Sequence, residues 1–169
     1  MCRRTGCCEQ ATDAIKRGCL ADIGGADLEL SLWLFHGEDS RLRCVAGTYP
    51  ADSKAWSKSF PWGFGFRGMA MRRARLEWYA RSEGRYPWPG DILDGPKPEA
   101  YLLCVPFPLP VGREFPQGPV EFCRLIACLS SCDMASGMSK LRNVENRGKV
   151  ASLVFFEVEK VVRSLGQRT

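Results

Sequence analysis

The stretch that decides the fold is Gly65-Phe66-Arg67-Gly68-Met69-Ala70, which follows the turn-forming residues Pro61-Trp62-Gly63. Glycine accepts a positive φ and lets the backbone approach a neighbour closely, and a helix start attracts anions. The stretch lacks the third glycine of a dinucleotide-binding loop and the Gly-Lys-Ser/Thr of a P-loop. We therefore expect a turn and a short helix, over residues 69–74, that shape the wall of a pocket.

The bulk composition is that of an ordinary globular domain. The chain has 169 residues, of which 45% are hydrophobic and 25% charged. We expect a single domain over residues 1–169, with residues 1–7 as a flexible N-terminus and residues 148–165 as a terminal helix. The apolar runs are too short to span a bilayer, and charged residues follow Met1-Cys2-Arg3-Arg4 where a signal peptide would be apolar. These features predict a cytoplasmic protein without membrane contact.

The net charge of +5 comes largely from arginines in the middle of the chain. Such a group could meet a phosphate, an acidic partner or a nucleic acid. No basic run exceeds two residues, the acidic residues are spread throughout, and no nucleic-acid motif is present. The pattern argues against nucleic-acid binding.

Nine cysteines, an odd number without any C-x-x-C pair, accompany a single histidine, His36, which lies at a turn. This pattern argues against a structural metal site, and no metal ligand is predicted. Cys104 and Cys128 lie in apolar runs and read as small buried hydrophobes of a reducing compartment. The adjacent Cys7 and Cys8 are the cysteines that we single out as candidates for reactivity.

Hydrophobic periodicity predicts an α+β order of elements. We expect a helix over residues 8–20, a hairpin of strands 28–36 and 41–49, a loop or short helix over 50–58, and a strand or continued helix over 76–80. Further strands are expected over 101–107 and 122–130. The Pro- and Gly-rich segment 84–99 has the composition of a lid or binding loop, and segment 108–119 that of an exposed hairpin arm.

The last segment carries an apolar stripe at steps of three and four residues. Its members are Ala151, Val154, Val158, Val161 and Leu165. Such a stripe either packs on the protein's own sheet or pairs with a second copy as a homodimer, and both interpretations stay open.

Three stretches together resemble the GAF domain family. Residues 32–42 are similar to its opening hairpin, residues 65–70 to its Gly-x-x-Gly-x-Ala turn, and residues 101–107 with 125–131 to two of its strands. The resemblance covers about residues 8–165. It implies a central antiparallel sheet in a GAF/PAS-like α+β fold, with the N- and C-terminal helices packed together on one face and a ligand cavity on the other.

The resemblance also suggests ligands, which this sequence does not match. Family members bind cyclic nucleotides, tetrapyrroles, haem or small metabolites, many dimerise through the terminal helices, and a few reduce free methionine sulfoxide. Residues 65–70 and 91–100 lack the cysteines that the reductases carry there, no cysteine has a neighbouring histidine for tetrapyrrole attachment, and the Asn-Lys and Asp-Glu pattern of cyclic-nucleotide binders is missing. The sequence therefore names no cofactor.

We predict a non-catalytic sensory or regulatory domain that binds a small molecule or dimerises in signalling. The candidate ligand-binding residues are aromatic or apolar side chains around one cation: Phe64, Phe66, Arg67, Met69, Trp78, Tyr86, Trp88 and Tyr101. The same aromatic residues could equally fill the core, and Arg75 is a second candidate for an anionic group.

Two other functions stay open. One is a GAF-like thiol enzyme such as a free methionine sulfoxide reductase, using Cys104 or Cys128, although nothing in the sequence is seen to lower the pKa of these thiols. The other is a ligand-free scaffold for protein interaction.

Overall fold

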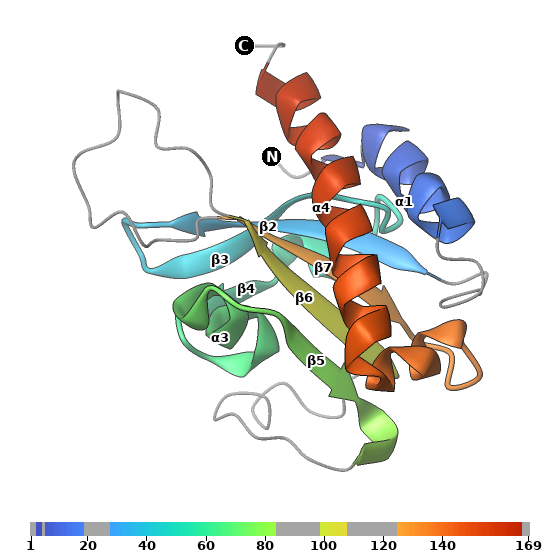
Figure 1. Ribbon diagram of the computed structural model, residues 1–169. Helices are drawn as coiled ribbons and strands as arrows, with labels where there is room; N and C mark the ends of the chain where they lie inside the picture. The colour runs from blue at the N-terminus through green and yellow to red at the C-terminus, as the bar shows by residue number, and fades with distance from the viewer. Residues whose placement is uncertain (1–2, 5, 19–27, 84–98, 108–124, 167–169) are drawn as a thin grey trace.

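The computed structural model describes residues 3–4, 6–18, 28–83, 99–107 and 125–166 (Figure 1). Its centre is a sheet in the order β1-β3-β2-β7-β6-β5, and β4 pairs with β3 beside this path. The strands are β1 (Arg3–Arg4), β2 (Glu29–His36), β3 (Arg41–Gly47), β4 (Ser59–Pro61), β5 (Glu77–Ala80), β6 (Tyr101–Phe107) and β7 (Leu125–Ser131). All neighbours are antiparallel except the short pair β1 and β3. The predicted α+β class with a central antiparallel sheet is confirmed.

Helices cover the two faces of this sheet differently. α1 (Gly6–Gly18) and α4 (Val144–Gly166) pack together on one face, and α3 (Gly65–Arg73) lies on the other (Figure 1). Short 3-10 helices, η1 (Lys54–Ser57), η2 (Arg81–Glu83) and η3 (Gly137–Arg142), connect these elements. None of the helices in the described ranges is long and apolar enough to span a membrane.

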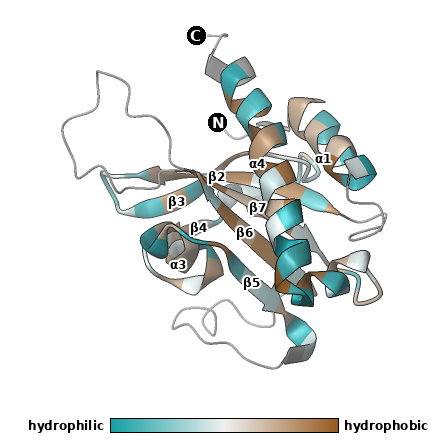
Figure 2. Cartoon of the chain, in the orientation of Figure 1, coloured by the Kyte–Doolittle hydropathy of each residue, from teal (hydrophilic) through white to brown (hydrophobic). Residues whose placement is uncertain are grey.

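The alternation of side chains along β2 builds both halves of the core. Leu30 and Leu32 point to the cluster under α1 and α4, whereas Trp33 joins the cluster under α3. β2 pairs with β3 on one side and with β7 on the other, so it is a central strand covered on both faces, as its apolar sequence predicts. In Figure 2, β6 is brown along most of its length, as expected for a strand buried on both faces.

α3 begins at Gly65, four residues before the predicted start, because the two glycines of the motif are part of the helix. Gly63 and Gly65 have φ angles of 79° and 63°, in the left-handed region. At Gly68 an added Cβ would lie 2.6 Å from the Pro61 carbonyl oxygen. The glycines therefore serve geometry, by reversing the chain and by allowing α3 to touch the turn that precedes it.

α4 also begins earlier than predicted, at Val144 and not at residue 148. The side chain of Asn143 accepts a hydrogen bond of 2.8 Å from the backbone N–H of Glu145, which satisfies a free donor of the first turn. The predicted stripe of Ala151, Val154, Val158 and Val161 is buried against α1 and the sheet. These four side chains are thus occupied within one chain and are not available to a second copy; the side chain of residue 165 lies outside the described part.

The remaining predicted elements agree in type with the structure where it describes them, but α1 includes residues 6 and 7, which were assigned to a flexible N-terminus, and the short strands β1 and β4 were not predicted. Residues 6–18 form the first helix, residues 77–80 form a strand and not a continued helix, and residues 54–57 form a 3-10 turn. β6 has the predicted bounds, and β7 is described from Leu125. The predicted lid over 84–99, apart from its last residue, and the predicted arm over 108–119 lie outside the described residues.

Candidate functional site

A pocket of about 240 Å³ opens on the α3 face of the sheet. It lies where β2, the segment after β3, β4 and α3 meet the residues that precede β6 and follow β7. Its lining residues are Glu29, Trp33, Tyr49, Ser53, Lys54, Lys58, Phe60, Arg67, Glu99 and Cys132.

Arg67 forms the inner wall of this pocket. Its side chain is only 5% exposed, and its Nη2 atom donates to Glu99 Oε1 at 3.1 Å. The guanidinium carbon lies 4.9 Å from the centroid of the Trp33 ring and 5.0 Å from that of Phe60, so two aromatic faces enclose it. Its Nε atom is buried and has no hydrogen-bond partner among the described residues.

The guanidinium stays charged in this setting. Burial works against the charge of Arg67. The negative charges that Cys128, Tyr49 and Glu99 carry when deprotonated outweigh burial and raise the pKa of the guanidinium well above its ordinary range. The pocket is therefore lined by a residue that carries a permanent positive charge.

A small hydrogen-bond network supports the aromatic side of the pocket. Trp33 Nε1 donates to Ser31 Oγ at 2.9 Å, and the Tyr49 hydroxyl donates to the same oxygen at 3.2 Å. Burial raises the pKa of Tyr49 to about 12. Tyr49 is therefore a neutral hydrogen-bonding group, and the ring of Trp33 is fixed beneath Arg67.

The charges around the pocket favour an anionic or zwitterionic molecule. Lys54, Lys58 and Arg67 are cationic, and Glu29 and Glu99 are acidic, which leaves one positive charge in excess. The two lysines lie at the exposed rim, whereas Arg67 lies in the interior. An anion that enters between the lysines would meet Arg67 at the inner end.

Two thiols lie next to Arg67 on the same face of the sheet. Cys104 and Cys128 face each other across β6 and β7, and their sulfurs are 3.6 Å apart. Burial raises the pKa of Cys128, but the hydrogen bond with Cys104 and the charge and hydrogen bonding of Arg67 bring that pKa below its ordinary value. The expectation that nothing lowers the pKa of these thiols is therefore wrong, because sequence spacing could not show Arg67 beside them.

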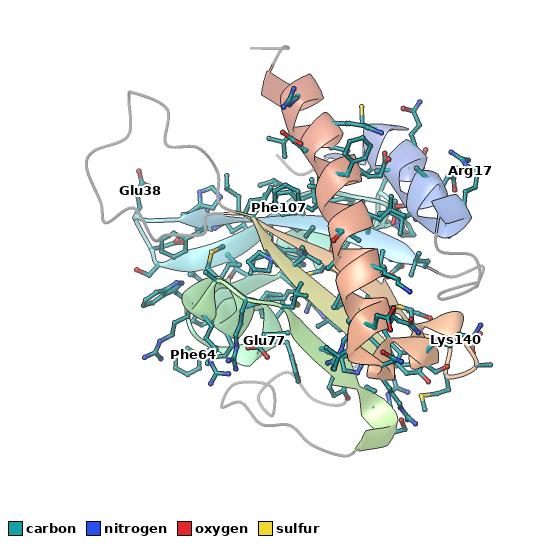
Figure 3. All side chains as sticks on the ribbon, viewed as in Figure 1. Arg17, Glu38, Phe64, Glu77, Phe107 and Lys140 are labelled. Carbon is teal, nitrogen blue, oxygen red and sulfur yellow. The ribbon has the colours of Figure 1, made fainter. Side chains whose placement is uncertain are left out.

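The predicted ligand-binding residues lie in several different places. Arg67 lines the pocket. Phe66 and Met69 are buried but are not among the lining residues, and Phe66 packs on Tyr79 at a ring separation of 5.0 Å. Phe64 is 46% exposed on the outer side of α3 (Figure 3).

Trp78 and Tyr101 lie elsewhere. They stack at 5.8 Å on the opposite face of the sheet, in the cluster under α1 and α4. Tyr86 and Trp88 lie outside the described residues. Arg75 is exposed and pairs with Glu77 at 3.2 Å, away from the pocket lining.

The residues that sequence reasoning missed are those that enclose Arg67: Trp33, Tyr49, Phe60 and Glu99. For Trp33 a signal existed, because the period-two alternation of side chains along β2 places Trp33 on the other face of the sheet from Leu32. Glu99 carried no such signal, since its contact with Arg67 spans 32 positions of the chain.

A larger hollow of about 460 Å³ lies between α1 and α4 and includes Cys7 in its lining. The charged side chains that line it, Arg17, Glu157 and Lys160, are not buried. Cys8 is buried in the core beneath. Since the hollow holds no buried charge, we place the candidate site at Arg67.

His36 ends β2, and within the described ranges no three His, Cys, Asp or Glu side chains are grouped to hold a metal ion.

No protein-family model and no curated protein sequence matches this chain. Among solved structures, the GAF domain of a phosphoenolpyruvate-protein phosphotransferase from Coxiella burnetii superposes with a TM-score of 0.56 at 14% identity, over 95% of this chain and 85% of that one. The fold is that of a GAF domain.

Two further solved structures are similar to this chain. An NreA protein from Staphylococcus aureus, mutated in its nitrate-binding site, has a TM-score of 0.50 at 12% identity, over 80% of this chain and 95% of that one. A free methionine-R-sulfoxide reductase from Neisseria meningitidis has a TM-score of 0.49 at 10% identity, over 91% and 80% of the two chains.

Proposed function

We propose that this GAF domain is a non-catalytic sensory or regulatory module in signalling, which binds a small anionic or zwitterionic molecule in the Arg67 pocket. The observation that carries the proposal is that Arg67, a residue of the pocket lining, has a buried guanidinium. Its Nε atom has no hydrogen-bond partner in the described structure. A buried donor without a partner costs about 1–3 kcal/mol, and an acceptor on a ligand would remove that cost.

The shape of the guanidinium narrows the ligand chemistry. An arginine fork binds carboxylate, nitrate-like or phosphate-like oxygens in pairs, and Glu99 uses only one nitrogen of Arg67 in the contact described here. A volume of about 240 Å³ is below the range of about 300–1,000 Å³ typical of drug-sized ligands. Both points favour an inorganic anion or a small carboxylate, and the acidic Glu29 in the lining would suit the amino group of a zwitterion.

A catalytic role for the thiols is less well supported. Cys104 and Cys128 are fully buried and do not belong to the pocket lining. A sulfoxide substrate would have to bring its sulfur within bonding distance of a thiolate, and Arg67 forms the wall on that side. We therefore propose binding without turnover.

The test is a thermal-shift screen followed by calorimetry on the full chain. The panel contains nitrate, sulfate, phosphate, mono- and dicarboxylates of two to five carbons, and amino acids including methionine sulfoxide. A ligand present at 100 times its Kd stabilises by about 2.7 kcal/mol, which for a chain of this size raises Tm by roughly 5–10 °C.

A matched pair of variants locates the site. Arg67→Lys keeps the charge but loses the fork, and we expect the affinity to fall at least tenfold. Arg75→Lys makes the same change at an exposed position outside the pocket and should bind as the wild type does. If no member of the panel raises Tm, or if Arg67→Lys binds normally, the proposal fails and an interaction scaffold without ligand becomes the better interpretation.

A further inference from the structure

We propose that Cys104 and Cys128 are an oxidisable thiol pair, which a hydroperoxide converts into a disulfide between β6 and β7. The two residues are directly opposite in the register of the strands, and their sulfurs lie 3.6 Å apart. This inference concerns the thiols alone and does not depend on ligand binding in the pocket.

The backbone geometry accepts this bond. Opposite residues of an antiparallel pair have Cα atoms about 4.5 or 5.5 Å apart, and both separations fall within the range of about 4.4–6.8 Å found for disulfides. The sulfurs must approach by about 1.5 Å to reach the usual bond length of about 2.05 Å. We expect rotation of the two side chains to supply this movement.

The surroundings give the two thiols different roles. The guanidinium of Arg67 lies beside Cys128 and favours its thiolate, which is the reactive form of a cysteine. Cys104 is hydrogen-bonded to that sulfur and is placed to react with it next. Cys44 lies in the same buried cluster, but its sulfur hydrogen-bonds to the Ala46 carbonyl oxygen at 3.5 Å.

The chemistry balances with one hydroperoxide for each disulfide. The Cys128 thiolate attacks the terminal oxygen of the hydroperoxide; an S–O bond forms, the O–O bond breaks, and the alkoxide or hydroxide leaves and takes up a proton. The Cys104 thiol then attacks the sulfur of the sulfenic acid; the S–S bond forms, the S–O bond breaks, and the oxygen leaves as water with the proton of Cys104. Two thiols have lost two electrons, and the hydroperoxide has gained them.

The oxidant must be small because both sulfurs are fully buried. Arg67 lines the pocket and also interacts with Cys128, and we expect the oxidant to reach the sulfur from the pocket when this side chain is displaced. Hydrogen peroxide is close to water in size and uncharged, which suits such a path.

The experiment uses the full chain, reduced and then freed of reductant. It is treated with hydrogen peroxide in buffer, quenched with acid, alkylated with N-ethylmaleimide in denaturant, digested and analysed by mass spectrometry. We expect a cross-linked peptide that joins Cys104 to Cys128, while Cys44 remains alkylated as the buried reference. A cross-link that appears only in urea, or disulfides that join other cysteines while Cys104 and Cys128 stay alkylated, would overturn the proposal.

Single variants separate the two roles. In Cys104→Ser the sulfenic acid has no partner, and we expect dimedone to label Cys128; in Cys128→Ser, dimedone should leave Cys104 unlabelled. Arg67→Gln removes the charge that lowers the pKa of Cys128, so a smaller fraction of Cys128 is thiolate and the cross-link should form several-fold more slowly. Equal labelling in the two serine variants would contradict the assigned order. If a variant does not fold, the wild-type cross-link still decides the proposal.

Discussion

Replacement of Gly68 by alanine tests the reasoning about the glycine motif. Inside a helix, glycine to alanine normally stabilises by about 0.5–1 kcal/mol. At Gly68 the new Cβ would lie 2.6 Å from Pro61 O and 3.1 Å from Gly63 N, and both atoms are backbone that a rotamer change cannot move. Overpacking of this kind costs about 1–3 kcal/mol. The upper value of about 3 kcal/mol applies here, because the crowded atoms belong to the backbone. After the gain in helix propensity is subtracted, Gly68→Ala should lower the free energy of unfolding by about 2 kcal/mol.

The matched control is Gly148→Ala, a glycine within α4 whose added Cβ meets nothing within 4 Å. It should gain about 0.5–1 kcal/mol, a rise in Tm of about 1–4 °C, whereas Gly68→Ala should lower Tm by about 4–8 °C. Urea denaturation of both variants and the wild type measures these changes. If Gly68→Ala is as stable as the wild type, or gains like the control, the close contact between α3 and the preceding turn is not what requires glycine there.

Three further comparisons test the core and the pocket. Tyr49 has a pKa of about 12 in the folded chain against 10.0 as its ordinary value, so its stabilising contribution is complete below pH 10 and is lost as the pH rises to 12. Between pH 9 and pH 12, urea denaturation should show the wild type losing about 2–3 kcal/mol more than Tyr49→Phe, and equal losses would refute this. Phe66→Ala should lose about 3–5 kcal/mol because Phe66 is buried, while Phe64→Ala, at an exposed neighbour, should lose less than about 1 kcal/mol. Val158→Ala should lose about 2 kcal/mol and Phe156→Ala, at a position 56% exposed, less than 1 kcal/mol; the reverse order would mean that α4 packs through its other face.

The longer strands β2, β3, β6 and β7 were predictable because each is an apolar or alternating run, whereas the short strands β1 and β4 were not predicted. β6 is a continuous, mostly apolar run, and its predicted bounds, residues 101–107, agree with the structure. Helix starts were less predictable, since a helix begins where its first donors find acceptors. Asn143 caps α4 before the apolar stripe starts, and Gly65 begins α3 through a φ that composition does not reveal.

The site was only partly predictable, because the sequence did not show to which face of the sheet each side chain of β5 and β6 points. Trp78 and Tyr101 belong to the same elements as pocket-side residues, yet β-strands turn alternate side chains to opposite faces. One step along β5 or β6 therefore separates a pocket-side residue from one that packs under α4. Arg67 was found because it lies within a recognisable motif, while its partner Glu99 follows a segment whose composition gives no register.

The position of Arg67 is costly if its role is only structural. A buried ion pair is often no more stabilising than apolar residues of the same volume, and Arg67 additionally leaves Nε without a partner in the described structure. If Arg67 binds a ligand, the interaction with the anion would offset the cost of burying the guanidinium. If Arg67 acts on the thiols, its interaction with the thiolate of Cys128 would offset that cost. The two roles make different demands. Anion binding needs the paired nitrogens of the fork, whereas the thiolate needs a charge and one hydrogen bond, both of which a lysine can also supply. Arg67→Lys should therefore weaken anion binding while leaving the rate of the Cys104–Cys128 cross-link within about threefold, whereas Arg67→Gln should reduce both.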